Sequence, residues 1–289
     1  MFEVYDDQEA ATALLDTATS WVRDRGYDAI RGPASFTTLE EVGLLIDGFT
    51  RPVLLMPYNQ PYYQQLVEGA GFGKAMDVHS VIFEREALVK ANTIERAGKI
   101  TERLQRRSGA VIRPFNRRQK KREFELFKEI YNRAWEKNWG FVPMTEAELD
   151  AMVESLSMFL DPDFAFFAEI DGEPVGFMLS VPDLNEVLHR VYPRPGVPEL
   201  WSMAKALWYW KLRPVITGMR TPLMGVVEEH RDKGIDIALY YATVKAIWPH
   251  QRYQWLDASW ILETNELLNI LSSFGGRIYK THRFYEKKF

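Results

Sequence analysis

The chain has 289 residues, of which 46% are hydrophobic and 26% are charged, so neither a disordered nor a membrane-spanning protein is expected. It contains no cysteine, which excludes disulfides, thiolate metal sites and a cysteine nucleophile. The formal net charge of -4 argues against nucleic-acid binding, and no apolar run approaches the roughly 20 residues that cross a bilayer. We therefore expect a cytoplasmic protein of one or two domains, without a membrane partner.

Residues 1–90 form the first predicted unit. Apolar residues recur at helical spacing from Gln8 to Arg25, and Gly26 is placed to end this helix. The other elements expected here are strands at residues 27–31 and 78–83, a strand or loop at 42–49, and a short helix at 62–68.

Residues 91–109 form a charged connector. From Arg96 to Arg122 the chain carries eleven Lys or Arg residues and one acidic residue, Glu102. The favoured interpretation is a solvent-exposed helix face, because charge runs of this kind are usually solvated. The alternative is a contact for an anionic partner such as RNA or a CoA phosphate, although the run lacks the interleaved aromatic residues on which bases stack.

Residues 110–289 are predicted to form one complete α/β unit. Thr145 and Glu148 have the spacing of a capping box, and Asp171-Gly172 joins two apolar runs as a β-hairpin. The nine tryptophans and thirteen tyrosines of the chain are expected mainly in packed cores. The elements expected in chain order are a strand at 109–114, helices at 120–139 and from 145, hairpin strands at 165–170 and 175–181, an aromatic helix after the loop 194–198, a strand at 223–227, a helix at 235–247, a strand at 255–261, a helix at 265–273 and a strand at 278–285.

The segment from Leu223 to Tyr241 is the most informative stretch of the chain. An apolar strand leads through a charged turn to Gly234, where a helical pattern begins. Backbone N–H groups at a helix N-terminus bind anions, so this turn is a candidate phosphate site, and Arg231 and Lys233 add positive charge to it. Two aspartates in the same turn oppose an anion there.

The turn Arg231-Asp232-Lys233-Gly234-Ile235-Asp236 resembles the R/Q-x-x-G-x-G/A pyrophosphate loop of the GNAT superfamily of acyl-CoA-dependent N-acyltransferases, with Asp236 in place of the last small residue. The order of elements in residues 110–289 also resembles the GNAT fold from end to end. Trp139 to Pro143 and Pro182 to Asn185 resemble an uncharacterised bacterial branch in which a second GNAT-like domain precedes the first. The resemblance implies an α/β fold with a mixed central sheet flanked by helices, preceded by a partial GNAT-like unit.

The partial unit, residues 1–90, is similar to the second half of a GNAT domain. A half-sheet leaves one edge of backbone groups unpaired. Either the two units share a sheet, or another chain covers the edge, or the chain is a fragment. These alternatives stay open, and so does a homodimer.

The resemblance implies an acyl-CoA donor, with acetyl-CoA as the expected thioester. Backbone groups at the end of the strand before the turn would pair with the pantetheine arm as an added strand does. Trp139 and Phe141 fall in the loop that lines the acceptor pocket in the family. The alternative is that they pack between the two helices that this loop connects. The residues implied for donor binding are Val226, Val227, Arg231, Asp232, Lys233, Gly234, Ile235 and Asn265.

Attack of an amine on a thioester needs a base for the ammonium proton and an acid for the leaving thiolate. The candidate base is Glu263 at a strand end, ahead of Glu228 and Glu229. The family often places a tyrosine acid on the helix after Asn265, but none lies in residues 265–276, and Tyr285 is the remaining candidate. The five histidines show no metal-ligand spacing, so no metal site is expected.

The predicted function is therefore transfer of an acyl group from acyl-CoA to an amine of a small molecule or an amino-acid-like acceptor. One alternative is a non-catalytic ligand-binding protein on a degenerate GNAT scaffold, favoured by Asp236 and the missing tyrosine. Another is a transferase with an aminoacyl-tRNA donor, for which the basic run at 96–122 would contact RNA. The net negative charge disfavours a nucleic-acid partner.

Overall fold

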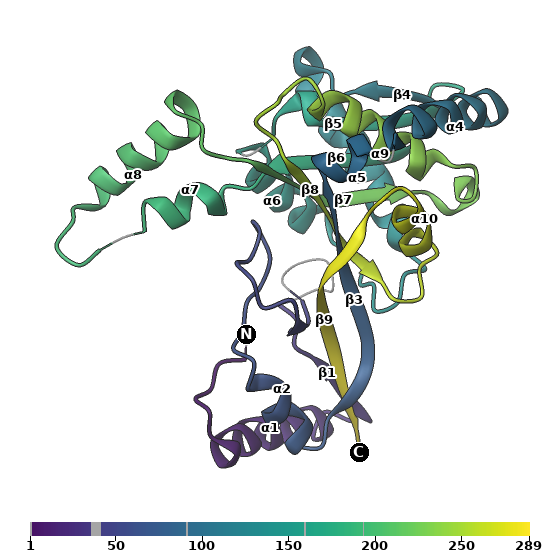
Figure 1. Cartoon of the computed structure of the whole chain (residues 1–289). Helices are drawn as coiled ribbons and strands as arrows, with labels where there is room; N and C mark the ends of the chain where they lie inside the picture. Colours follow the sequence, from purple (N-terminus) through teal and green to yellow (C-terminus); the bar gives the residue numbers. More distant parts are fainter. Residues whose placement is uncertain (1, 36–41, 91, 159, 193) are drawn as a thin grey trace. The chain divides into compact units, whose positions relative to one another are not determined.

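The computed structural model describes residues 2–35, 42–90, 92–158, 160–192 and 194–289 (Figure 1). It divides the chain into two compact units. Unit 1 consists of Met1–Val81, Ser259–Leu271 and Arg277–Phe289, and unit 2 consists of Ile82–Ala258 and Ser272–Gly276. Strands β3 (Gly73–Glu84) and β8 (Trp255–Leu262) each run from one unit into the other. None of the described helices is both long enough and apolar enough to cross a membrane.

Unit 2 is built on a mixed sheet with the strand order β8-β7-β6-β5-β4. Neighbouring strands run antiparallel except for β7 and β8, which are parallel. The strands are β4 (Val111–Pro114), β5 (Ala165–Ile170), β6 (Glu173–Pro182) and β7 (Gly218–Val226), together with β8. The helices are α3 (Arg85–Lys90), α4 (Thr93–Ser108), α5 (Lys120–Trp135), α6 (Glu146–Ser157), α7 (Asn185–Arg190), α8 (Glu199–Leu207) and α9 (Ile235–Ile247).

Helices cover both faces of this sheet. Phe177 and Met178 are neighbours on β6, so their side chains point to opposite faces. The Phe177 ring packs against Phe127 of α5 with centroids 4.7 Å apart. On the other face, Thr243 of α9 donates a hydrogen bond to the Met178 sulfur at 3.3 Å. The predicted mixed sheet flanked by helices is therefore confirmed.

Two local predictions in unit 2 are confirmed as well. Thr145 and Glu148 form the capping box that begins α6, with side-chain to backbone bonds in both directions. Asp171 and Gly172 have φ angles of 52° and 85°, and two positive values in succession are what a tight hairpin turn requires.

The expected connector is a helix packed against α9. The buried residues of α4 are Thr93, Gly98 and Thr101, and a side chain at Gly98 would meet the Tyr241 hydroxyl of α9. The basic side chains of α4 are exposed: Arg96, Lys99, Arg103, Arg106 and Arg107. This part of the basic run is therefore the solvated face of a packed helix, as favoured from the sequence.

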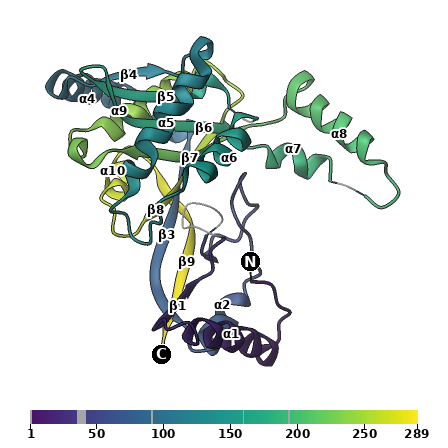
Figure 2. The same cartoon turned by 180° about the vertical axis from the view of Figure 1, so that it is seen from behind.

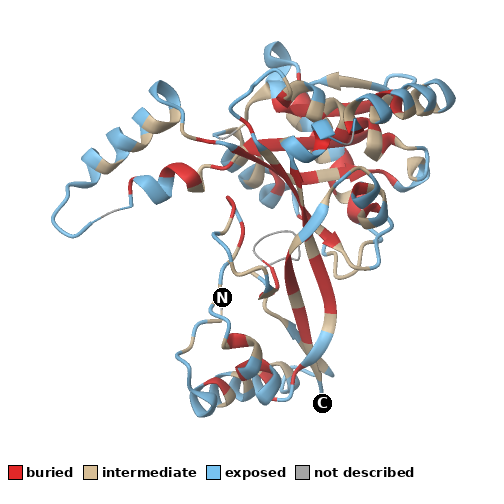
Figure 3. Cartoon of the chain, viewed as in Figure 1, coloured by how far each residue is buried: buried red, intermediate tan, exposed pale blue. Residues whose placement is uncertain are grey.

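Unit 1 contains the strand order β1-β9-β3, and β2 also pairs with β9. Its central strand, β9, comes from the C-terminal part of the chain. It pairs with β1 at Ala29↔Lys288 and with β2 at Leu44↔Arg283. The buried stretch of β9 is visible in Figure 3. The elements are α1 (Gln8–Arg23), β1 (Ala29–Gly32), β2 (Leu44–Asp47), α2 (Tyr63–Gly69), β9 (Arg277–Lys288) and the start of α10 (Leu267–Ser273).

The division into units differs from the expected boundaries, which assigned residues 1–90, 91–109 and 110–289 to separate parts. The structure instead groups residues 259–271 and 277–289 with the N-terminal segment. Strands β1, β2 and β3 of the N-terminal segment all pair with the chain's own β9. A hydrophobicity pattern identifies strands but not their partners, and β-pairing joins residues far apart in the chain.

Candidate functional site

Strand β7 separates from one of its two partners before it ends. The parallel register with β8 stops at Thr221↔Ala258. On the other side, β7 stays paired with β6 as far as Gly176↔Val226. The last five residues of β7 therefore have a registered partner on one side only, among the residues that the structure describes.

The free edge of β7 carries specific backbone groups. Val227 N–H donates to the Val175 carbonyl at 2.9 Å, so Val227 faces β6. Backbone groups alternate in direction along an antiparallel ladder, and those of Met224 and Val226 consequently point away from β6. They form the kind of edge that an extended ligand with amide groups can join as an added strand.

Arg231 lies at this edge, but its guanidinium is turned back into the protein. Its Nε donates to the Val226 carbonyl at 3.3 Å. One terminal nitrogen donates to the Ala134 carbonyl, in the last turn of α5, at 2.6 Å and approaches Asn138 Oδ1 at 3.5 Å. The side chain thus fastens the turn after β7 to α5, whereas the sequence led us to expect a positive charge directed at a phosphate.

The turn after β7 reaches α9 through Gly234. Its φ of 75° lies in the left-handed region, and a Cβ at this position would collide with the Leu104 side chain of α4. Glycine is therefore required both by the backbone and by the close packing of α4. The side chain of Ile235 is buried, while Asp232 and Lys233 are exposed.

Asp236 stands in the first turn of α9, where the helix presents its N–H groups. Burial raises the pKa of this carboxyl, and the backbone N–H groups of Ile237 and Asp236 oppose the rise. The carboxylate is therefore held by the same end of the helix that an anion would approach. Lys233 is the exposed cation of the turn, and its Nζ lies 3.0 Å from His230 Nδ1.

The residues expected to line an acceptor pocket, Trp139 and Phe141, lie half-buried in the loop between α5 and α6. The Phe141 N–H donates to the Asn138 carbonyl at 3.1 Å, so this loop begins beside the Arg231 contact. The structure therefore brings the start of the predicted acceptor loop and the predicted donor turn together within unit 2.

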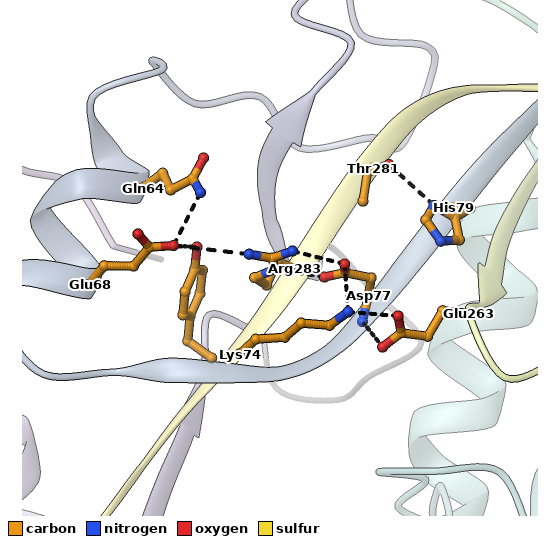
Figure 4. Close-up of polar contacts among 9 residues, drawn as sticks. Gln64, Glu68, Lys74, Asp77, His79, Glu263, Thr281 and Arg283 are labelled. Atoms are coloured by element: carbon orange, nitrogen blue, oxygen red, sulfur yellow. Dashed lines mark hydrogen bonds and ion pairs between the residues drawn. The ribbon is translucent and has the colours of Figure 1, made fainter.

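A cluster of charged side chains occupies unit 1 (Figure 4). The Arg283 guanidinium binds both oxygens of Asp77, at 2.7 and 2.9 Å. Lys74 Nζ lies 2.9 Å from Asp77 Oδ2 and donates to Glu263 Oε2 at 2.7 Å. Glu263 is held further by the Asp77 backbone N–H, which donates to Oε1 at 3.1 Å.

Asp77 is the buried anion of this cluster. Burial works to raise the pKa of its carboxyl, but hydrogen bonds from Arg283 and Lys74 outweigh burial and lower it. Both oxygens of Glu263 accept hydrogen bonds, so its charged form is also well satisfied. Asp77, whose pKa is lowered by its two cations, is a weaker proton acceptor than a free carboxylate.

His79 is a half-buried imidazole beside this cluster, and the sequence did not single it out. Burial lowers the pKa of its imidazole, against the opposing effect of Asp77 and Glu263. The ring is consequently neutral at pH 7, and its Nδ1 lies 3.1 Å from the Thr281 hydroxyl. A neutral half-buried imidazole is well suited to accept a proton from an ammonium group.

Two other predicted site residues lie in unit 1. Tyr285 is buried and donates to Glu68 Oε1 at 2.9 Å; burial, followed by that hydrogen bond, raises the pKa of its hydroxyl. Asn265 accepts the Leu267 N–H at 2.9 Å through Oδ1 and so caps the start of α10. Glu263, Tyr285 and Asn265 thus belong to unit 1, and the donor turn belongs to unit 2.

No family model matches the chain. Two bacterial proteins do: it is 33% identical over 293 residues to protein YghO of Escherichia coli (strain K12), covering 100% of this chain and 73% of that protein. It is 34% identical over 298 residues to the bacterial ceramide synthase of Caulobacter vibrioides, covering 99% of this chain and 74% of that protein. The chain belongs to the family of these two proteins.

Solved structures show that the chain has the fold of GCN5-related N-acetyltransferases. A GCN5-related N-acetyltransferase from Sphaerobacter thermophilus superposes with a TM-score of 0.54 at 13% identity, over 96% of this chain and 68% of that one. The glucosamine N-acetyltransferase region of a fungal GH3 β-N-acetylglucosaminidase superposes with a TM-score of 0.53 at 14% identity, over 95% of this chain and 27% of that one. The resemblance drawn from the sequence is confirmed at the level of the fold.

In this member of the YghO and ceramide synthase family, two features of the site lie beyond local sequence patterns. His79 sits on β3 between Val78 and Ser80, and no motif in its surrounding sequence distinguishes it from a core histidine. The early end of the β7–β8 ladder depends on where two distant strands pair. Among the described residues, no group of His, Cys, Asp or Glu is arranged to hold a metal ion.

The contacts of Arg231 predict a structural role that is measurable without any ligand. Arg231→Ala removes hydrogen bonds to two carbonyls and should lower the free energy of unfolding by about 2 kcal/mol, or Tm by roughly 4–8 °C. Lys233→Ala, two residues away in the same turn, removes an exposed cation and should leave Tm unchanged. Equal effects of the two substitutions in a thermal melt would contradict this role.

The charges around Asp77 predict a pH dependence of stability. Because its pKa is lowered in the folded state, Asp77 stabilises the fold above its unfolded pKa, and this contribution is lost as pH falls through the folded pKa. Asp77→Asn should lower stability by about 2 kcal/mol at neutral pH and flatten the decline of Tm at acid pH.

Asp16 provides the control for this measurement. It forms an exposed ion pair with Lys287 at 3.2 Å. Asp16→Asn should change Tm by less than about 1 °C, because exposed ion pairs contribute little. If Asp77→Asn melts like the unchanged protein between acid and neutral pH, the ion-pair cluster does not stabilise unit 1.

Proposed function

We propose that the chain is an N-acyltransferase that moves an acyl group from an acyl-CoA thioester to a primary amine. The observation that carries the proposal is the free edge of β7, which leads through a short turn directly to the N-terminus of α9. An acyl-CoA has an extended pantetheine arm with two amides and a diphosphate. Its amides match the backbone groups of Met224 and Val226, and its diphosphate suits a helix N-terminus.

The residues of the turn fit the two parts of the donor unequally. The strand edge fits the pantetheine arm, except that Arg231 already uses the Val226 carbonyl. At the helix end, the Asp236 carboxylate competes with the diphosphate for the same N–H groups. A positive charge on Lys233 offsets part of this repulsion. Donor binding is therefore proposed to be weaker at the phosphates than in a site with a small residue at position 236.

The acceptor is proposed to be an amphiphilic amine. One relative, 34% identical along 99% of this chain, is named a bacterial ceramide synthase, and a ceramide is a long-chain amino alcohol whose nitrogen carries an acyl group. This supports an amino alcohol with an alkyl chain as the acceptor and a long-chain acyl-CoA as the donor. The alternative, expected from the sequence, is acetyl-CoA as the donor and a small or amino-acid-like amine as the acceptor.

The reaction forms a C–N bond and breaks the C–S bond of the thioester. The amine must first lose a proton, and the CoA thiolate must gain one. Glu263 and Tyr285 remain the proposed base and acid, but both side chains are already hydrogen-bonded.

Activity is tested by the release of free CoA thiol from a series of acyl-CoA thioesters, from acetyl to palmitoyl, with a long-chain amino alcohol or a short amino alcohol as acceptor. We expect release that requires both a thioester and the long-chain acceptor. Glu263→Gln should lower kcat by roughly a hundredfold, a typical general-base contribution.

The alternatives give other results in the same assay. Binding of acyl-CoA without thiol release from any acceptor would leave a non-catalytic ligand-binding protein. Transfer from an aminoacyl-tRNA, with binding that weakens steeply as salt rises, would indicate the RNA-dependent transferase. Equal thiol release with short and long amines would contradict the amphiphilic acceptor but would still support an acyltransferase.

Asp236→Asn tests the competition at the helix end. Because its pKa is raised in the folded state, the ionised carboxylate costs stability as pH rises above the unfolded value near 3.8, and the cost persists at neutral pH. The variant should therefore have a higher Tm at pH 7, with a difference that disappears at acid pH. It should also show a larger upward Tm shift with acyl-CoA.

Asp232→Asn is the matched control, since its carboxylate is exposed in the same turn. It should change Tm less than Asp236→Asn and should enhance the acyl-CoA shift less. Identical acyl-CoA shifts for Asp236→Asn and the unchanged protein would mean that the diphosphate does not approach α9. Gly234 is not a clean test position, because any side chain there collides with Leu104.

A further inference from the structure

The chain makes a long excursion between β6 and β7. Residues 185–213, here called the aromatic arm, contain α7, a loop, α8 and a π-helical turn, η3 (Trp208–Leu212). Figures 1 and 2 both show α7 and α8 projecting away from the sheet of unit 2. Neither α8 nor η3 contains a buried residue, and α8 is mostly exposed in Figure 3.

The exposed face of the arm is its apolar face. Leu200, Met203 and Leu207 recur at the spacing of one helix face, and this is the face that normally packs on a core. Here Leu200 is 78% exposed, and nearby Trp201 and Leu212 are 66% and 71% exposed. Exposed apolar surface of this kind marks an interaction site. The expectation that tryptophans lie mainly in packed cores is wrong for this arm.

The arm is positively charged in a negatively charged protein. Residues 185–213 contain five Lys or Arg and two Glu, while the whole chain has a net charge of -4. One of the two acids, Glu186, is buried and accepts hydrogen bonds from the N–H and hydroxyl of Thr217. The exposed cations Lys205, Lys211 and Arg213 therefore outnumber the arm's single exposed carboxylate, Glu199.

The root of the arm is fixed to unit 2. Val187 and Val191 are buried, and the Glu186 contacts join the start of the arm to the segment that leads into β7. A cleft of about 360 Å³ lies where the C-terminal end of the arm meets the rest of unit 2, and it is lined in part by Trp210, Lys211 and Tyr253. The arm is thus a held element with an apolar outer face.

We propose that the aromatic arm docks on the surface of a membrane that contains anionic phospholipids. Trp and Tyr side chains favour the membrane–water interface, and basic residues beside an apolar face are attracted to anionic headgroups. From Glu199 to Leu212 the arm is shorter than the roughly 20 residues that span a bilayer, so it lies on the surface. A second copy of the chain fits less well, because two arms with the same positive charge repel each other.

This inference does not rest on the proposed acyl transfer, because docking is measured without substrates. It also differs from the expectation of no membrane partner, which was based on the lack of a spanning segment. An interfacial arm needs only exposed apolar area and cations.

The test is sedimentation of the full chain with vesicles of phosphatidylglycerol and phosphatidylcholine, compared with vesicles of phosphatidylcholine alone. Binding should be stronger to the anionic vesicles and should weaken as salt rises. The double variant Leu200→Ser, Trp201→Ser should lower the partition coefficient by at least about tenfold for each side chain removed. The variant Lys205→Gln, Lys211→Gln should lower binding about fivefold per charge on anionic vesicles and leave binding to phosphatidylcholine unchanged.

Trp21→Ser is the matched control, since Trp21 is an exposed tryptophan of α1, outside the arm. It should bind vesicles like the unchanged protein, and the arm variants should keep an unchanged Tm because they remove solvent-exposed side chains. Vesicle binding that is absent, or equal in the arm variants and the unchanged protein, overturns the proposal. A dimer in sedimentation equilibrium that the arm variants dissociate also overturns it, in favour of a second copy as the occupant.

Discussion

The early separation of β7 from β8 is the constraint on which the candidate donor site depends. Parallel pairing stops at Thr221↔Ala258, while β7 remains tied to β6 up to Val226. A sheet normally satisfies the backbone groups of an inner strand on both sides, so an inner strand with one free side is a place where a ligand can pair. The adjacent helix end adds N–H groups for negative charge. One irregularity of pairing thus aligns two different kinds of binding groups.

Charge within the turn sets the character of this site. Arg231 donates hydrogen bonds to carbonyls of β7 and α5, so it stabilises the turn. The same donors are then not directed at a phosphate. Asp236 faces the first N–H groups of α9, and its raised pKa reflects burial near a site where a phosphate would be expected. The turn is therefore well built as structure and only partly suited to an anion. Its binding strength is expected to depend on the strand edge more than on the helix end.

Outside the donor turn, polar and apolar side chains are distributed in an unusual way. Unit 1 gathers Lys74, Asp77, Glu263 and Arg283 into a satisfied ion-pair cluster beside a neutral histidine. Unit 2 does the opposite in its aromatic arm, where large apolar side chains face water. A buried charge needs partners, and an exposed apolar surface needs a covering. The first requirement is met within the chain, and the second indicates a partner outside it.

Local patterns in the sequence were enough to predict many of the elements and the fold. The capping box at Thr145, the hairpin turn at Asp171-Gly172 and the glycine before α9 are each specified by residues a few positions apart, and all three have the expected geometry. The pairing of β9 with β1 and β2, the inward turn of Arg231, the position of His79 and the exposure of Trp201 were not predictable in this way. The first three depend on contacts between residues far apart in the chain, and the exposure of Trp201 depends on the lack of a packing partner. The spacing of adjacent residues does not encode either property.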